Sequence, residues 1–288
     1  MGKVRNFILH NDEKITNDQH FADLDNRAFN YGDGLFESMR MIEGKIPFLD
    51  LHLKRLTKGC ETLDITPPFP LVASEILTRV ESLCLSNKIF KSARVKLVVF
   101  RQPGGFFTPE KRESDFVLSL SRMEEKDFQL NKKGILLGVC PEPLILPNSL
   151  SAVKKLGGTT YVYAGNFAKS KGWDDVLLVN PEKRVVEATA SNIFILKDDK
   201  LVTPPLTDGP LPGVMREVVM KLAHELNLTP LEAYLRPDQL EHVDEIWLTN
   251  SVRGVQWVGG FGKRRFFSTK AREMMNILNN HVAEMENV

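Results

Sequence analysis

The chain has 288 residues, of which 42% are hydrophobic, enough to bury one large core or two medium ones, and length alone slightly favours two domains. With 38 basic and 37 acidic residues the formal net charge is +1, so composition gives no general attraction to nucleic acid or to an anionic membrane. Cys60, Cys84 and Cys140 show no CxxC spacing, which argues against a disulfide framework and a thiolate zinc site. Without a long apolar run or a signal-peptide pattern at the start, we expect a soluble, cytoplasmic protein.

Short apolar runs in the first half of the chain predict a sheet with two helices. A polar hairpin turn is expected at residues 11–14 and a tight turn at Glu43 and Gly44. The expected strands cover 4–9, 35–42, 45–48, 93–100 and 116–120, and the expected helices begin at Asp50 and span 70–86. The charged stretch 123–133 then marks a linker between a smaller domain, 1–122, and a larger domain, 134–288.

The second half of the chain again mixes both kinds of element. We expect strands over 134–140, 175–179, 185–186, 192–197, 201–203 and 245–249, and helices over 160–171, 214–226 and 269–285. The predicted fold class is therefore α/β, or α+β, with two domains. A cleft between two domains is a common place for a ligand site.

Two adjacent lysines, Lys154 and Lys155, are the first candidates for chemistry. A lysine pair is more often a solvated surface feature, but here the residues on both sides are apolar or small. We therefore expect at least one of the two amines to be partly buried. Burial lowers the pKa of a lysine from about 10.4 and makes the amine a usable nucleophile.

An acid and a glycine follow in the same stretch. Glu187 lies in the apolar context VVEATASNIFIL, where it is either an edge-strand carboxylate that faces water or a partner for a protonated ring nitrogen. Gly213 precedes a helix, so the NH groups of Val214 and Met215 can face a phosphate, and Arg55 can add positive charge. Each feature is common alone, but together they suit a phosphorylated aldehyde cofactor.

Several motifs, taken in order, resemble a known family. NRAFNYGDGLFESMRMIEGKIPFLDLHLKRL, the lysine with its following leucine, VVEATASNIF and LPGVMRE are similar to the signatures of the class IV aminotransferases, the fold type IV pyridoxal-phosphate enzymes. This family includes branched-chain and D-amino-acid aminotransferases and aminodeoxychorismate lyase. The resemblance covers about residues 6–258. It implies a two-domain fold like that of D-amino-acid aminotransferase, with pyridoxal 5'-phosphate in the interdomain cleft and a homodimer that completes the site near its interface.

The resemblance also implies roles for single residues. Lys154 would form the aldimine with the cofactor, because its spacing to Gly172 and Glu187 matches members whose lysine is followed by one residue and then leucine. Lys155 remains the alternative, since KLGG is similar to the branched-chain enzymes. Glu187 would bind the pyridine nitrogen, and Asn192 matches the asparagine of the motif. Further cofactor contacts are expected from Arg55, Leu211, Gly213, Val214, Met215 and Ser251.

Substrate contacts are harder to assign. Tyr31 and Arg101 are candidates for binding a substrate carboxylate from the smaller domain, with Arg253 as a third, and a core tyrosine and a surface arginine are the competing explanations. Met215 stands where the family usually has threonine, so one hydroxyl contact to phosphate is missing. The segment IWLTNSVRGVQWV resembles the lyase and its relatives more than the branched-chain enzymes.

The expected function is transamination of a small amino acid and 2-oxo acid pair by a pyridoxal-phosphate enzyme. The alternatives are 4-amino-4-deoxychorismate lyase, which releases pyruvate and 4-aminobenzoate, and a catalytically silent binding relative. The six histidines form no HxxxH pair, and GxGxxG and GxxxxGK[ST] motifs are missing, so a metal site or a nucleotide site has weaker support. The expected partners are a small-molecule substrate and a second copy of the chain, without nucleic acid or membrane.

Overall fold

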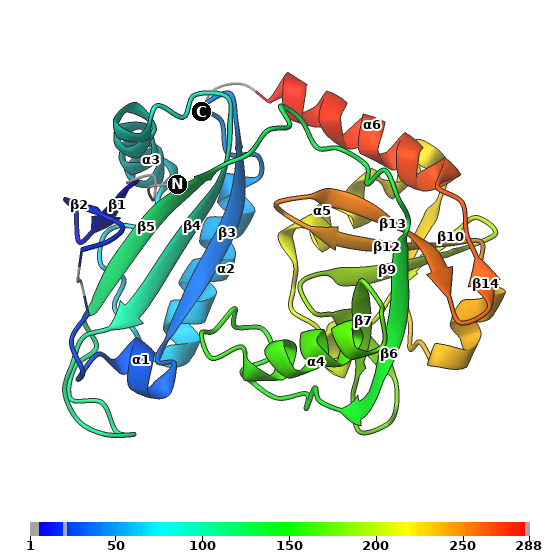
Figure 1. Ribbon diagram of the computed structural model, residues 1–288, viewed down its shortest axis with the longest axis horizontal. Coiled ribbons are helices and arrows are strands. Elements are labelled where there is room, and N and C mark those ends of the chain that lie inside the picture. The colour runs from blue at the N-terminus through cyan, green and yellow to red at the C-terminus, as the bar shows by residue number, and fades with distance from the viewer. Residues whose placement is uncertain (1–5, 20–21, 286–288) are drawn as a thin grey trace. The chain divides into compact units, whose positions relative to one another are not determined.

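A computed structural model describes residues 6–19 and 22–285, and these divide into two compact units. Unit 1 comprises the described residues up to Asp127 together with Val153–Gly157, and unit 2 comprises Phe128–Ala152 and Gly158–Met285 (Figure 1). The boundary between Asp127 and Phe128 falls inside the stretch 123–133 that was expected to be a linker. The sequence pattern assigns the lysine pair to the larger domain, whereas the five residues around it pack with unit 1.

Unit 1 is an antiparallel sheet with helices on one face (Figure 1). Its five strands lie in the order β2-β1-β5-β4-β3, which places β2 and β3 at the edges. The elements are β1 (Phe7–His10), β2 (Glu13–Thr16), α1 (Arg27–Tyr31), β3 (Gly34–Ile42), α2 (Leu49–Leu63), α3 (Ala73–Asn87), β4 (Ser92–Arg101) and β5 (Ser114–Arg122).

Alternation along the strands builds the core of unit 1. Successive side chains of a strand point to opposite faces, so every second residue of β3 and β4 turns toward α2 and α3. The core formed in this way is aliphatic, and it contains Leu35, Met39, Val95, Leu97 and Val99 from the strands and Leu53, Leu56, Ile76 and Val80 from the helices.

One strand expected in unit 1 does not form. Residues 45–48 were predicted to return as a strand after the turn at Glu43 and Gly44, but only a single bridge joins Ile42 to Lys45. Phe48, with φ of 59°, then turns the chain into α2, so this prediction is wrong. The predicted strand start at Val4 lies outside the described residues.

Unit 2 is built on a nine-stranded mixed sheet. Its main path is β11-β10-β9-β12-β13-β6-β7-β8, and β14 pairs with β13. The strands are β6 (Ile135–Pro143), β7 (Asp175–Val179), β8 (Val185–Ala188), β9 (Asn192–Lys197), β10 (Lys200–Thr203), β11 (Thr229–Glu232), β12 (Glu245–Asn250), β13 (Gly254–Phe261) and β14 (Arg264–Arg265).

The helices of unit 2 are α4 (Thr159–Ser170), α5 (Val214–Leu222) and α6 (Thr269–Glu284), with 3-10 turns at Leu206–Asp208, Ala223–Leu226 and Pro237–His242. Strands β7, β8 and β9 are buried along almost their whole length, which explains their continuous apolar runs in the sequence. No helix in the described ranges is both long enough and apolar enough to cross a bilayer.

Candidate functional site

The lysine pair lies on a segment that extends the sheet of unit 1 beyond its edge strand, β3. The Phe36 NH donates a hydrogen bond to the Lys154 carbonyl at 2.9 Å, and the Leu156 NH donates to the Gly34 carbonyl at 2.9 Å. The turn before β3 fits against the same segment, because a Cβ built on Gly32 would lie 3.4 Å from the Gly157 backbone. These contacts fix the backbone of the lysine segment to β3.

The two lysines are not equivalent in this segment. Lys154 is partly buried, and its Nζ lies 4.6 Å from the centroid of the Phe36 ring, whereas Lys155 is exposed. An ammonium over an aromatic face is attracted by the ring quadrupole, which holds the Lys154 side chain against β3. Of the two candidates, Lys154 is therefore the more buried and the more restrained.

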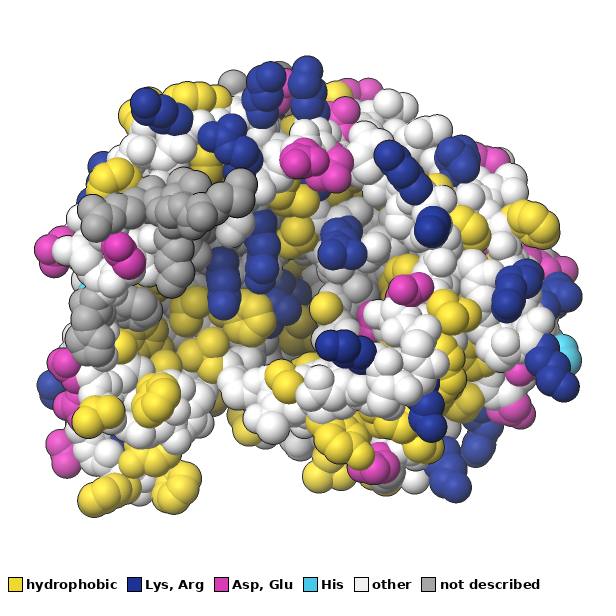
Figure 2. All heavy atoms as spheres, in the orientation of Figure 1, with side chains coloured by type: hydrophobic (Ala, Val, Ile, Leu, Met, Phe, Trp, Pro, Cys, Tyr) yellow, Lys and Arg dark blue, Asp and Glu magenta, His cyan; other side chains and the backbone are white. Residues whose placement is uncertain are grey.

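A third lysine, which the sequence patterns did not single out, shares the same ring. Lys96 on β4 places its Nζ 5.4 Å from the Phe36 ring centroid. Burial lowers the pKa of Lys96, and the nearby Arg94 lowers it further. Figure 2 shows Lys and Arg side chains gathered over β3 and β4 of unit 1. This face of the sheet is therefore suited to an anionic group.

On the opposite side of β3, a buried carboxylate holds two residues of α2. The Arg55 Nε donates to Glu37 Oε1 at 2.8 Å and its Nη2 donates to Oε2 at 2.6 Å, while His52 Nδ1 lies 2.7 Å from Oε2. Glu37 and His52 are each only 1% exposed. The expected phosphate ligand Arg55 is thus part of an ion-paired cluster, which we call the Glu37 cluster (Glu37, His52 and Arg55).

The charges of the Glu37 cluster follow from its contacts. Burial alone would raise the pKa of Glu37, but the Arg55 charge and the hydrogen bonds from His52 and Arg55 outweigh it and lower the pKa from 4.5 to about 2. Burial also lowers the pKa of His52, although the Glu37 carboxylate opposes this. At neutral pH Glu37 is therefore ionised, and a neutral His52 donates its Nδ1–H to it.

The low pKa of Glu37 predicts a loss of stability in acid. The unfolded chain binds this proton near pH 4.5 and the folded chain only near pH 2, so the contribution of Glu37 is complete above about pH 5 and declines as the pH falls. The shift from 4.5 to about 2, at 1.36 kcal/mol per pKa unit, sets an upper limit of roughly 3.5 kcal/mol on this contribution. Urea unfolding between pH 6 and pH 3 measures it, with Glu37→Gln as the variant that lacks the titration.

We expect the wild type to lose part of its advantage over Glu37→Gln between pH 6 and pH 3, with the rest lost only below pH 3, because all other carboxylates titrate in both proteins. Curves of unfolding free energy against pH that run parallel would contradict the assignment.

The two residues expected to bind a substrate carboxylate have different environments. Tyr31 closes α1 and is 38% exposed, with the Arg27 guanidinium 4.9 Å from its ring centroid. Arg101 is 4% exposed and donates to Asp33 at 3.0 Å and to the carbonyls of Leu63, Asp64 and Lys111. Tyr31 is accessible to a ligand, whereas the contacts of Arg101 favour a role in holding the end of β4.

In unit 2, the acid expected to face the cofactor ring is held by two donors. Glu187 lies on β8 and is 5% exposed. The Tyr161 hydroxyl donates to its Oε1 at 2.8 Å, and the Leu211 NH donates to its Oε2 at 3.0 Å. Burial raises the pKa of Tyr161, and the Glu187 charge raises it further, so Tyr161 stays protonated as a donor. The structure therefore gives Glu187 a buried, hydrogen-bonded environment and not a water-facing one.

Asn192, Leu211 and Gly213 are joined in the same unit. The Asn192 Nδ2 donates to the Leu211 carbonyl at 2.8 Å, and a Cβ built on Gly213 would lie only 1.9 Å from Asn192 Oδ1. Gly213 is the N-cap of α5 and offers no side-chain hydrogen bond to the helix. The first NH groups of α5, which include those of Val214 and Met215, are therefore left for another acceptor.

The close approach of Asn192 to Gly213 predicts a strongly destabilised Gly213→Ala variant. The added methyl group must displace the Asn192 amide and break its bond to Leu211, for which we expect a loss of about 2–4 kcal/mol. Gly165→Ala is the matched control, because Gly165 lies within α4 with open space around its Cβ position. That variant should gain about 0.5–1 kcal/mol. Urea unfolding of both variants measures the contrast, and equal effects would contradict it.

The loop after β12 is ordered by its asparagine. The Asn250 Oδ1 accepts from the NH groups of Val252 at 3.1 Å and Arg253 at 2.9 Å, and its Nδ2 donates to Ser191 Oγ at 3.1 Å. Such an asparagine turn fixes the backbone around the expected phosphate ligand Ser251. Ser251 is partly buried and Arg253 is exposed.

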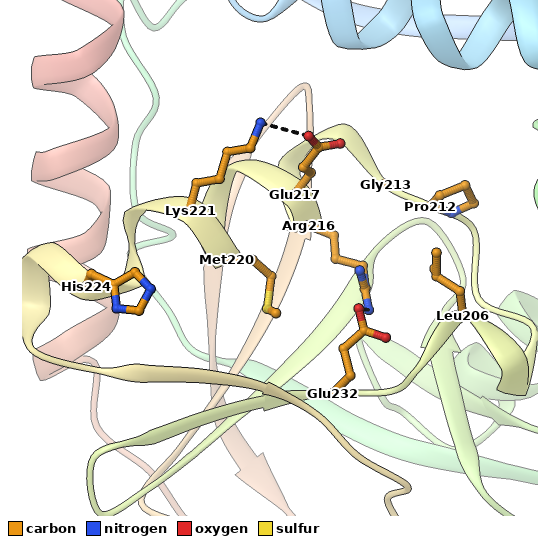
Figure 3. A pocket seen from close by; sticks show the side chains of 9 residues that line it. All are labelled: Leu206, Pro212, Gly213, Arg216, Glu217, Met220, Lys221, His224 and Glu232. Carbon is orange, nitrogen blue, oxygen red and sulfur yellow. Dashed lines mark ion pairs between the residues drawn. The ribbon is translucent and has the colours of Figure 1, made fainter.

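A separate pocket of about 530 Å³ lies along α5 (Figure 3). Arg216 and Glu232 point toward one another in it, with their ion pair at 3.0 Å, and Lys221 pairs with Glu217 at 2.8 Å. Neither Glu187 nor Leu211 lines this pocket. Gly213 does line it, so the pocket adjoins the start of α5, although the Glu187 carboxylate lies outside it.

Besides Lys96, the sequence patterns missed three further residues of these groups. Glu37 and His52 lie inside the quoted motif, and the only available signal was the spacing of His52 and Arg55, three residues apart on one helix face. Tyr161 stands two residues into α4 and carries no spacing signal toward Glu187. These contacts form only when a strand and a helix pack together, and the sequence gives no local signal for that packing.

Comparison with known proteins decides the family. The sequence profile described as "Amino-transferase class IV" matches residues 34–259. The chain belongs to the class IV aminotransferases. It is therefore an enzyme of a pyridoxal-phosphate-dependent family, as the motifs predicted.

The relatives of this chain include proteins named for two different activities, a lyase and an aminotransferase. The chain is 29% identical over 245 residues to an aminodeoxychorismate lyase of Vibrio harveyi, covering 84% of this chain and 88% of the relative. It is 32% identical over 226 residues to a putative branched-chain-amino-acid aminotransferase of Methanocaldococcus jannaschii, covering 77% and 76%.

A solved structure confirms the predicted fold class of the enzyme. The branched-chain amino acid aminotransferase of Thermobaculum terrenum, in its PLP form, superposes with a TM-score of 0.83 at 20% identity. The match covers 96% of this chain and 94% of the other. At this identity the likeness concerns the fold alone.

Proposed function

We propose that this class IV enzyme is an aminotransferase that binds pyridoxal 5'-phosphate through Lys154 and acts on a small amino acid and 2-oxo acid pair. The observation that carries the proposal is the environment of Lys154, which is partly buried, fixed to β3 by backbone hydrogen bonds and held over the Phe36 ring. The exposed Lys155 has no comparable environment.

The predicted site residues suit the chemical groups of the cofactor. The buried Glu187 carboxylate suits a protonated ring nitrogen, and the Leu211 backbone is bonded to the same carboxylate. The uncapped start of α5 suits a phosphate, with Val214 and Met215 as backbone donors. Arg55 and Ser251 complete the proposed phosphate ligands. Met215 is 1% exposed and lacks a hydroxyl, so its contribution is limited to its NH group.

Each proposed residue has a defined task. The bound cofactor supplies an electron-withdrawing ring that takes up the electron pair left at the substrate Cα. With the cofactor bound, the Lys154 amine would be the group that holds it and that accepts the proton from the substrate Cα. Glu187 keeps the ring nitrogen protonated, and Tyr161 and the Leu211 NH hold the carboxylate in place for this.

The substrate carboxylate has two proposed contacts on unit 1. Tyr31 presents an accessible ring and hydroxyl, as the sequence motif suggested. Lys96 offers a positive charge beside the Phe36 ring. We propose Lys96 in place of Arg101, whose guanidinium is used in internal hydrogen bonds.

A lyase activity is the second candidate, and the loop around Asn250 favours it. Its sequence TNSVRG is similar to the lyase and its relatives, and the Vibrio harveyi relative carries that name over 84% of this chain. In that reaction Lys154 would remove the same proton, but pyruvate would leave from the substrate. The two candidates share the proposed cofactor residues and differ in the substrate.

Absorbance spectroscopy and product analysis test both candidates. Adding pyridoxal phosphate to the protein should give the absorption band of lysine-bound cofactor, and the absence of this band would exclude the proposal. A transaminase then needs a keto-acid acceptor to turn over an amino acid. Release of pyruvate from aminodeoxychorismate without any acceptor would instead identify the lyase.

We further propose that the enzyme is a homodimer. A loop of unit 1 displays Phe106 and Phe107 with 82% and 89% of their surfaces exposed, and the Phe107 ring centroid lies 5.3 Å from that of Tyr31 on α1. Arg27 holds the loop through hydrogen bonds to the carbonyls of Gly104, Gly105 and Phe106, so the aromatic side chains are presented by an ordered backbone. Exposed apolar clusters of this kind typically form contacts with another protein. Sedimentation equilibrium showing only monomer at micromolar concentration would refute the dimer.

A reducing, cytoplasmic location is supported by the cysteines. Cys60, Cys84 and Cys140 are all buried and free of disulfides. Persistent free thiols are typical of a reducing compartment.

A further inference from the structure

Two consecutive residues of β3 hold the two functional cations of unit 1. Phe36 contacts Lys154 through its backbone NH and its ring, and Glu37 binds Arg55. Because successive strand side chains point to opposite faces, one short piece of strand fixes Lys154 on one side and Arg55 on the other. The separation between the amine and the guanidinium is thereby set by the strand.

The contact between Glu37 and Arg55 is geometrically restrictive. Both carboxylate oxygens are engaged by the guanidinium, at 2.8 Å and 2.6 Å, and such paired bonds fix the plane of the guanidinium as well as its position. The Arg55 side chain is only 9% exposed, so solvent does not loosen the pair. A lysine at position 55 could not reproduce this arrangement.

His52 restrains the carboxylate from a further direction. It stands one helical turn before Arg55 on α2 and lies 2.7 Å from Glu37 Oε2. Since His52 is neutral, the positive charge of Arg55 and the negative charge of Glu37 cancel within the cluster. A cluster with no net charge attracts an anion only weakly. The contribution of Arg55 to phosphate binding must therefore come from well-directed hydrogen bonds of its guanidinium.

We propose that Glu37, supported by His52, is a positioning residue that orients the Arg55 guanidinium for the phosphate of the cofactor. This inference rests on the proposed function, in which Arg55 is a phosphate ligand. It assigns a role to two buried residues that need not touch cofactor or substrate. In this proposal two neighbouring residues of β3 have different roles: Phe36 holds the Lys154 amine, and Glu37 orients the Arg55 guanidinium.

Comparing two cofactor forms tests the inference without measuring activity. The protein is titrated with pyridoxal 5'-phosphate and with pyridoxal, which lacks the phosphate, and both dissociation constants are taken from the absorption band of lysine-bound cofactor. In Glu37→Gln we expect affinity for pyridoxal phosphate to fall about tenfold, the scale of coupling between hydrogen-bonded neighbours, while affinity for pyridoxal changes less than about twofold. A merely structural role would weaken both ligands equally.

A double-mutant cycle assigns the effect to Arg55. If Glu37 acts through Arg55, Glu37→Gln should add little to the loss already caused by Arg55→Gln, and additive losses would overturn the inference. Glu75→Gln is the matched control, since Glu75 pairs with Arg79 at 2.6 Å on α3 of the same unit. This control should leave both dissociation constants unchanged.

The outcomes separate this inference from the proposed function. A wild-type protein that forms no band with either ligand refutes the proposed function itself. A band in the wild type, with an unchanged ratio of the two dissociation constants in Glu37→Gln, refutes only the positioning role. If Glu37→Gln does not fold, as judged by circular dichroism, His52→Gln takes its place, and an unchanged ratio in that variant likewise overturns the inference.

Discussion

Replacing Lys154 with alanine is expected to abolish the absorption band of bound pyridoxal phosphate and to lower kcat/KM by about 10³-fold or more, because the variant lacks both the covalent attachment and the base. The fold should survive, since the backbone hydrogen bond from Phe36 to the Lys154 carbonyl does not involve the side chain. Spectral titration and circular dichroism of the same preparation measure both effects.

Lys155→Ala is the matched control for this variant. Lys155 is the neighbouring residue, has the same side chain and is exposed, so its removal should leave the band and the rate within about threefold of the wild type. The opposite pattern, with the band lost in Lys155→Ala and retained in Lys154→Ala, would transfer the catalytic role to Lys155. Retention of the band in both variants would exclude attachment through this pair.

The second large effect is expected at Glu187. Glu187→Gln keeps the size of the side chain but removes the negative charge that stabilises a protonated ring nitrogen, so we expect kcat to fall about 10²–10³-fold. Tyr161→Phe retains the charge and removes only the hydrogen bond to Oε1, so its loss should stay near tenfold or below. Steady-state kinetics with a saturating cofactor concentration measures both variants.

A second tyrosine and glutamate pair in unit 2 provides the control for Glu187. The Tyr163 hydroxyl donates to Glu142 Oε1 at 2.7 Å on the exposed side of α4. Glu142→Gln makes the same chemical change at an exposed pair and should leave kcat unchanged within about twofold. Similar rates in Glu187→Gln and the wild type would remove Glu187 from the mechanism.

The sequence predicted elements best where one periodic signal dominated. The apolar runs of β7 and β9 have the same bounds in prediction and structure, because strands buried on both faces have an unbroken hydrophobic pattern. The predictions missed β13 and β11. The glycines of GVQWVGGF and the proline of TPLE mask their strand character, which depends on pairing with distant strands.

For the candidate site, the sequence indicated single residues but not the partners that surround them. The motif order pointed to Glu187, but its partner Tyr161 is 26 residues away and becomes a neighbour only through the packing of α4. For Arg101, the position at a strand end predicted a contact with a ligand. In the fold its guanidinium donates hydrogen bonds to three backbone carbonyls. Burial and hydrogen-bond partners decide such cases, and neither is encoded locally.

Because residues 153–157 belong to unit 1, the two units cannot be separated by cutting the chain at one point. The backbone passes between the units at Asp127 and Phe128 and again on each side of this short segment, so neither unit is encoded by one continuous stretch. A fragment ending near Asp127 would lack both lysines and would leave the backbone groups of β3 unpaired at the sheet edge, where another chain can add. Such a fragment should be expressed poorly in soluble form. If residues 153–157 were removed with the first unit, the larger fragment would retain Glu187 but would lack Lys154, the proposed cofactor lysine.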